Sequence, residues 1–204
     1  MDTPRGARVD VREREAARSA LARGGGRLRA STSGLHLDRP ALTMWFNVQP
    51  AALDYADRAP FRLRAEAYVH APPHRVFEIV TGEAMERWLP DFVALRWTSA
   101  EPYGVGSTRD LDLRALKVRE RVLAWEPGRR FAFTIVETSL PLLVQMIEDV
   151  HLEPIAARVT LLRWNVHYAP KAPLRALHPL ARGLFGRLWT GAVKNIAAYA
   201  LENG

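Results

Sequence analysis

The chain has 204 residues, of which 48% are apolar and none is cysteine, so it suits one domain with a tail and excludes disulfides, thiolate nucleophiles and Cys-ligated zinc. The net charge is +7, but residues 44–204 contribute only +3 of it, which argues against nucleic-acid binding. The longest apolar run, around Leu140–Ile147, falls far short of the ~20 residues that cross a bilayer, and we expect a cytoplasmic protein without a transmembrane segment.

Residues 1–43 form a basic stretch that does not resemble a folded domain. They hold nine arginines, five acidic residues and a run of three glycines. Apolar residues are few and no period persists, so burial cannot offset the entropy of ordering the stretch. Two interpretations remain open: a disordered basic extension, or a segment that is not translated because the start is Met44. Residues 44–60 are interpreted as a lead-in to a domain over 61–204.

The domain is predicted to begin with a strand and two short helices. Residues 61–70 alternate apolar and polar side chains, as a half-buried strand does. Pro72 and Pro73 end this strand and suit the first turn of a helix. That helix is expected to end near Gly82, and a second short helix is predicted over 83–88.

Further strands and one long helix complete the predicted order. The strands are expected at 92–98, 105–114, 115–125, 130–138, 145–153 and 158–168. The short breaks between them suit antiparallel hairpins, although the break near Arg114 has no strong turn residue. From Leu174 to Leu201 apolar residues recur at steps of three and four, which predicts a helix. The predicted class is α+β, with a sheet packed on its last helix.

Several motifs occur in an order typical of one family. They are Ala71–Phe77, Trp88–Pro90, Gly104–Ser107, Glu126–Arg130 and Arg163–Tyr168. Together they resemble the START-like (SRPBCC) superfamily, in its polyketide cyclase/dehydrase and lipid-transport branch. The resemblance implies a helix-grip, Bet v 1-like fold: a seven-stranded curved antiparallel sheet around a long C-terminal helix, with two short helices after strand 1. It also implies a cavity between the sheet and that helix.

Alternation along the strands indicates which side chains face this cavity. The apolar residues expected to bind a ligand are Trp88, Val93, Leu95, Trp97, Leu111, Phe133, Val150, Trp164, Val166, Leu184 and Leu188. Three charged residues, Arg109, Glu120 and Glu148, share the inward faces. A lone buried charge is costly, so Arg109 and Glu120 are predicted to pair across their hairpin.

The role of these charges stays open at the level of sequence. Arg109 and Glu120 either anchor a polar group of the ligand or satisfy one another. Glu148 becomes a general acid or base only if an apolar pocket raises its pKa, and a one-residue shift in register sends it to solvent. These three residues are the catalytic candidates.

Neither a cofactor nor a metal is expected. The Gly-x-Gly-x-x-Arg segment at 104–109 lacks the third glycine of a dinucleotide site and enters a strand. His70 and His74 are separated by two prolines and cannot share a helical face as metal ligands would.

Three functions therefore remain open. The first is binding or transport of a hydrophobic small molecule of the lipid, polyketide or isoprenoid kind. The second is a polyketide cyclase/dehydratase-type enzyme that uses the inward carboxylates. The third is a protein- or membrane-interaction module with a filled cavity, in weak contact with anionic lipid. The basic tail and Arg175, Arg182, Arg187 and Lys194 on the last helix motivate the third.

Overall fold

The structure, a computed structural model, describes residues 43–203, without the side chains of 173, 176–182 and 184. Apart from Thr43, the predicted basic extension at 1–43 lies outside the described residues.

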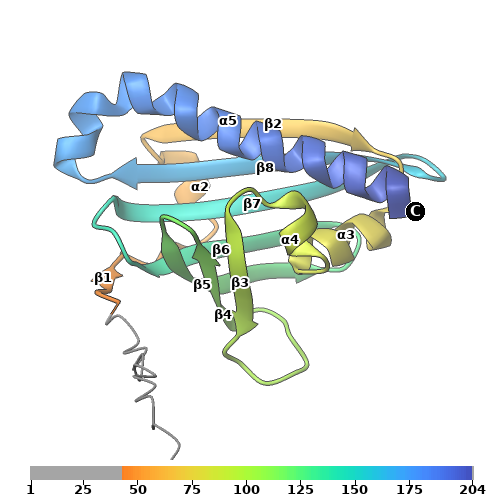
Figure 1. The fold of residues 1–204 in the computed structure, drawn as a ribbon, viewed down its shortest axis with the longest axis horizontal. Helices are drawn as coiled ribbons and strands as arrows, with labels where there is room; N and C mark the ends of the chain where they lie inside the picture. The colour runs from red at the N-terminus through yellow and green to blue at the C-terminus, as the bar shows by residue number, and fades with distance from the viewer. Residues whose placement is uncertain (1–42, 204) are drawn as a thin grey trace, which may run out of the picture. The chain divides into compact units, whose positions relative to one another are not determined.

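A long antiparallel sheet dominates the domain, and the C-terminal helix lies over one of its faces (Figure 1). The strands are β2 (Phe61–Val69), β3 (Phe92–Trp97), β4 (Thr108–Leu113), β5 (Lys117–Glu126), β6 (Arg130–Thr138), β7 (Leu143–Ala156) and β8 (Val159–Pro170). Their spatial order is β2-β8-β7-β6-β5-β4-β3, so the first strand pairs with the last. The α+β arrangement predicted from the sequence is confirmed.

Three helices of the domain frame this sheet face. They are α3 (Pro73–Thr81), α4 (Met85–Trp88) and α5 (Ala172–Asn203). As predicted, Pro73 opens α3 and Gly82 ends it. Gly82 has a φ of 149°, a backbone conformation that favours glycine, and a Cβ there would lie close to Leu95 Cδ2, at 3.0 Å. Among residues 43–203, no helix is long and apolar enough to cross a membrane.

The main core lies between the sheet and the three helices. Its largest fully buried side chains include Trp88, Ile79, Phe131, Leu162 and Ile196. Each belongs to a different element, and burying one such side chain stabilises the fold by about 1.5–3 kcal/mol. The C-terminal half of α5 therefore packs on the sheet through this core.

The lead-in at 44–60 is more structured than predicted. β1 (Phe46–Asn47) pairs with the end of β6 and adds an eighth strand, and α2 (Tyr55–Arg58) follows. Tyr55 packs with Ala51 and Ala59 against Ile147 in a second buried cluster. Ile147 alternates with the inward Met146 and Glu148, so this cluster lies on the opposite face of the sheet from the main core.

The predicted inward orientation of Val93 is wrong. The pairing of β3 with β4 shifts between Phe92 and Ala94, so Val93 is the extra residue of a bulge. Val93 is consequently 57% exposed. Leu95 and Trp97 pack against the core, opposite Leu111 and Arg109. A bulge of one residue breaks the alternation on which the prediction rested.

The break near Arg114 is confirmed as a tight hairpin turn. The backbone N–H of Leu113 donates to the Leu116 carbonyl over 2.8 Å. β4 begins later than predicted, at Thr108, because Gly104–Ser107 forms a turn closed by a 3.0 Å backbone bond. This hairpin brings the inward residues of β4 and β5 side by side.

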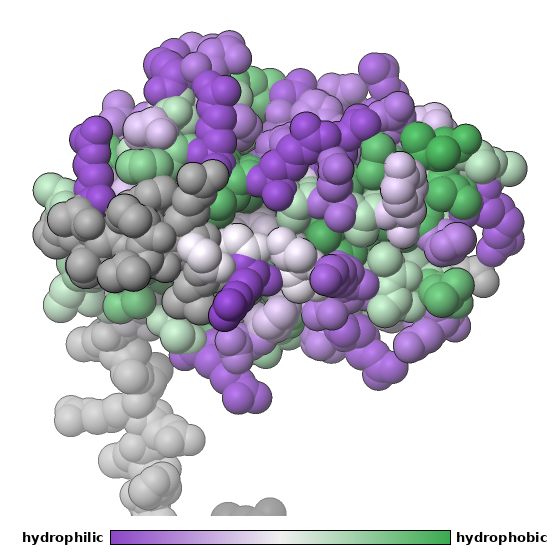
Figure 2. All heavy atoms as spheres, turned by 90° about the horizontal axis from the view of Figure 1, so that it is seen from above, coloured by the Kyte–Doolittle hydropathy of each residue, from purple (hydrophilic) through white to green (hydrophobic). Residues whose placement is uncertain are grey.

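The basic residues of α5 whose side chains are described lie on its exposed side. Arg175, Arg187 and Lys194 are exposed, and the side chain of Arg182 lies outside the description. In the coloured part of the view from the α5 side, hydrophilic and apolar groups are interspersed (Figure 2). The interaction-module hypothesis thus depends on basic residues that are spread along the helix.

Candidate ligand cavity

A cavity of about 160 Å³ lies between the sheet and the helices. Its walls come from β4 to β8 and from α3, α4 and α5. Among the residues described, the ionisable side chains on its wall are Arg109, Glu120, Glu148 and Tyr168. All other lining residues are apolar or are tryptophan, so the space combines an apolar wall with a few polar groups.

Many residues predicted to bind a ligand lie on this wall. They are Trp88, Arg109, Leu111, Glu120, Phe133, Glu148, Trp164 and Leu188. Leu95, Trp97, Val150 and Val166 pack in or against the core but are not among the lining residues. The exposed Val93 is not among them either, and the side chain of Leu184 lies outside the description.

One end of the cavity is bounded by residues that the sequence analysis did not select as site residues. They are Leu113, Leu116, Leu142, Leu143, Pro170 and Leu174. These residues stand where the β4–β5 turn, the start of β7 and the end of β8 approach the start of α5. Leu113 and Leu116 follow the alternation of their strands, whereas Leu142, Leu143, Pro170 and Leu174 stand at turns and strand ends that carry no sustained period.

The most consequential residue missed from the sequence is Trp189. It lines the cavity together with Phe185, Leu188 and Ala192 on α5. The predicted stripe ran through Leu184 and Leu188, whereas Phe185 and Trp189 keep the same four-residue spacing one position later. This second stripe was available in the sequence, since residues three and four apart share a helix face.

Arg109 and Glu120 form a buried ion pair at the cavity wall, as predicted. They stand opposite one another in the β4–β5 pairing. Arg109 Nε donates to Glu120 Oε2 over 2.5 Å, and each side chain is 3% exposed. Burial raises the pKa of Glu120, and the positive charge of Arg109 opposes this rise. The two charges therefore compensate one another inside the core.

The guanidinium of Arg109 is also held by other groups. Its Nη1 donates to the Thr81 carbonyl at the end of α3 over 2.9 Å. Its central carbon lies 5.3 Å from the ring centroid of Trp97, 5.0 Å from Phe131 and 5.3 Å from Phe133. Such distances allow cation–π attraction. Arg109 is thus fixed by a carboxylate, a carbonyl and aromatic rings.

Glu148 is held by two indole groups. Its Oε2 accepts hydrogen bonds from Trp164 Nε1 at 2.7 Å and from Trp189 Nε1 at 2.9 Å. No hydrogen bond to Oε1 is found from the part of the chain that the structure describes. One oxygen is thus fixed by β8 and α5, while the other is available to a molecule in the cavity.

Burial raises the pKa of Glu148 to about 7. The negative charge of Glu120 adds to this rise, whereas the hydrogen bonds from Trp189 and Trp164 and the charge of Arg109 oppose it. A carboxyl group with this pKa exists in both protonation states near neutral pH. It can therefore donate or accept a hydrogen bond, and a proton, at the cavity wall.

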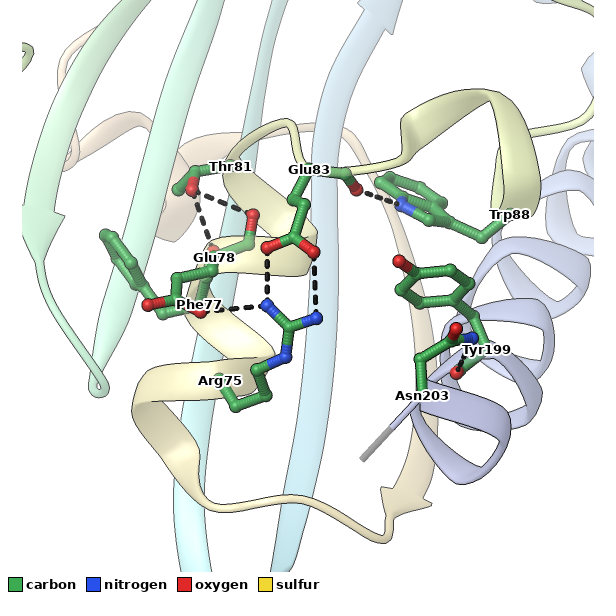
Figure 3. Close-up of polar contacts among 8 residues, drawn as sticks. All are labelled: Arg75, Phe77, Glu78, Thr81, Glu83, Trp88, Tyr199 and Asn203. Carbon is green, nitrogen blue, oxygen red and sulfur yellow. Dashed lines mark hydrogen bonds and ion pairs between the residues drawn. The ribbon is translucent and has the colours of Figure 1, made fainter.

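Trp88 is positioned by the corner where α3, α4 and α5 meet (Figure 3). Its indole Nε1 donates to the Glu83 carbonyl over 3.3 Å, and Asn195 of α5 donates to the Trp88 carbonyl over 3.0 Å. Arg75 binds the carboxylate of Glu83 from α3 (Figure 3). These contacts fix the aromatic wall that Trp88 presents to the cavity.

Residues 60–201 match a family model described as polyketide cyclase / dehydrase and lipid transport. In sequence, the chain is similar to the uncharacterized protein Rv2574 of Mycobacterium tuberculosis. The two are 28% identical over 149 residues, which cover 72% of this chain and 89% of the relative.

Solved structures show the same fold at lower sequence identity. The Zhui aromatase/cyclase from Streptomyces sp. R1128 matches with a TM-score of 0.61 and 15% identity, over 70% of this chain and 94% of that one. A START superfamily protein from Mycobacterium smegmatis matches with a TM-score of 0.61 and 16% identity, over 70% of this chain and 99% of that one.

Proposed function

The chain belongs to the polyketide cyclase / dehydrase and lipid transport family, and from that premise we propose that it binds a hydrophobic small molecule in the cavity between its sheet and α5. The observation that carries this proposal is the chemistry of the cavity wall. Apolar side chains surround a space that holds three buried charged residues, Arg109, Glu120 and Glu148. Concave apolar spaces with a few convergent polar groups are typical of ligand sites.

The size of the cavity sets the scale of the bound group. An apolar cavity of about 150 Å³ takes up a molecule such as benzene, and the volume here is about 160 Å³. A molecule built on one ring therefore matches this volume. Each CH₂ group that leaves water contributes about 0.8 kcal/mol to binding.

Isothermal titration calorimetry with butylbenzene, a neutral probe built on one ring, tests the proposal. We expect saturable binding of one probe per chain. Leu116→Trp fills part of the cavity and weakens binding at least tenfold, while Leu201→Trp makes the same change at a site 67% exposed and leaves it unaltered. A wild-type chain that fails to bind the probe, or a Leu116→Trp variant that binds it equally well, contradicts the proposal.

A second candidate function is acid–base catalysis on an aromatic polyketide chain. The observation that favours it is Glu148, whose pKa of about 7 suits proton transfer near neutral pH. One structural neighbour is an aromatase/cyclase by name. In this role Glu148 would move the proton, and Arg109 and Glu120 would hold a carbonyl or hydroxyl group of the substrate.

Measuring the turnover of a polyketide substrate by the variants Glu148→Gln and Arg109→Ala distinguishes catalysis from binding alone. Catalysis requires that Glu148→Gln loses turnover at least a hundredfold while its thermal unfolding stays that of a folded protein. Full turnover by both variants removes the catalytic roles and leaves the binding proposal unaffected.

A further inference from the structure

Arg109 is the one cationic side chain among the described lining residues, and its guanidinium already has partners. Arg109 Nε binds Glu120, and Arg109 Nη1 binds the Thr81 carbonyl. Three aromatic rings lie about 5 Å from the guanidinium carbon. A carboxylate on a ligand would therefore have to displace Glu120 from Arg109 before it could form an ion pair of its own.

Among the described lining residues, the remaining charged group is acidic. Glu148 faces α5 and β8 through the uncharged indoles of Trp189 and Trp164. The other ionisable groups on the described wall are the Arg109–Glu120 pair and Tyr168. An anionic ligand consequently meets the carboxylate of Glu148 in a largely apolar, buried space, where repulsion between like charges is strong.

A neutral oxygen fits the same position. A ligand hydroxyl can donate to the ionised Glu148, and a ligand carbonyl can accept from the protonated one. The oxygen Oε1 is available for this bond because both indoles bind Oε2.

We propose that the cavity selects neutral apolar molecules that carry one hydrogen-bonding oxygen, which pairs with Glu148, and that it rejects apolar carboxylates. This inference rests on the proposed function and narrows its ligand class. A carrier of free fatty acids would need a cationic side chain that is free to pair with the ligand's carboxylate. A carrier of phenols, alcohols or ketones needs a hydrogen-bonding group such as the carboxyl oxygen Oε1 of Glu148.

Isothermal titration calorimetry with three matched probes tests the selectivity. The probes are butylbenzene, para-butylphenol and para-butylbenzoate, which share one apolar body and differ in a single group. At about pH 8 we expect para-butylphenol to bind at least tenfold more tightly than para-butylbenzoate, and more tightly than butylbenzene. Equal or tighter binding of para-butylbenzoate overturns the inference while leaving the cavity intact. Failure of all three probes to bind overturns the proposed function and this inference together.

The variant Glu148→Gln tests whether Glu148 causes the preference for the phenol over the benzoate. The amide keeps an oxygen for the two indoles but removes the negative charge, so the preference for the phenol over the benzoate should narrow at least threefold. Lowering the pH to about 6 should narrow it in the wild type, because both probes keep their charge state while Glu148 takes up a proton. Glu202→Gln makes the same change at an exposed position of α5 and should preserve the preference. If the preference for the phenol changes neither with pH nor in Glu148→Gln, Glu148 is not the residue that causes it.

Discussion

Arg109 Nε lies 2.5 Å from Glu120 Oε2 in a core where both side chains are 3% exposed. Taking either charge out of water alone would cost several kcal/mol. The two residues come from neighbouring strands of one hairpin, where they stand directly opposite one another. The pair and the Thr81 carbonyl thus connect the sheet with α3 beside the cavity.

Removing one partner of this pair should destabilise the protein strongly. Arg109→Met or Glu120→Leu leaves a buried charge uncompensated, and we expect each to lower the free energy of unfolding by about 3–5 kcal/mol. The double variant should lose less than the sum of both, since no lone charge remains. Urea unfolding measures the three differences. Asp54→Ala, which breaks an exposed pair with Arg58, should change stability by no more than about 1 kcal/mol. Additive losses in the double variant would contradict this account.

Glu148 should make stability fall as the pH rises. Its pKa is about 7 in the folded protein against 4.5 ordinarily, so the folded state binds the proton more tightly. The stabilisation is complete below about pH 4.5 and is lost as the pH rises through 7. Relative to Glu148→Gln, the wild type should lose roughly 3 kcal/mol over this range. Urea unfolding of both proteins at several pH values checks it, and a difference that stays constant with pH would refute it.

The indole of Trp189 should hold the pKa of Glu148 down. Its hydrogen bond favours the ionised carboxyl group. Trp189→Phe removes this donor and keeps an aromatic ring, so the pKa of Glu148 should rise further. NMR titration of the labelled Glu148 carboxyl carbon measures the change. Trp45→Phe serves as a control because Trp45 packs on Arg119, away from the lining residues. An unchanged or lowered pKa in Trp189→Phe would show that the bond is not made.

Asp149 should contribute stability that acid removes. Burial raises its pKa, but hydrogen bonds from His151 and Arg130 outweigh burial and bring the pKa to about 2. The stabilisation is therefore present above its ordinary value of 3.8 and is lost as the pH falls through 2. We expect a loss of roughly 2 kcal/mol in the wild type. Asp149→Asn should not show this part of the acid transition, and identical acid unfolding of the two proteins would count against the prediction.

The buried charges could be predicted from the sequence because each is a charged residue on an otherwise apolar strand face. Arg109, Glu120 and Glu148 each occupy an inward position in an alternating strand, and the structure places all three at the cavity wall. The family also followed from motifs in order along the chain, and the family model matches residues 60–201.

Other features depend on tertiary structure that alternation does not encode. The bulge at Val93 arises from pairing with β4 and reverses the expected face. Trp189 belongs to a helical stripe one residue away from the predicted one, and its indole finds Glu148 only when α5 docks on β7 and β8. β1 and α2 are too short to produce a period. The cavity itself is space that packed side chains leave, so no local pattern could give its volume.

Native mass spectrometry of the freshly purified protein, alone and after addition of para-butylphenol, tests the central claim most directly. The account predicts one apolar molecule per chain, either retained from the cell or taken up from solution, and its loss in Leu116→Trp but not in Leu201→Trp. A wild-type chain that carries nothing and takes up nothing, with the mass of the free protein in both spectra, would contradict the claim that this cavity binds a hydrophobic small molecule.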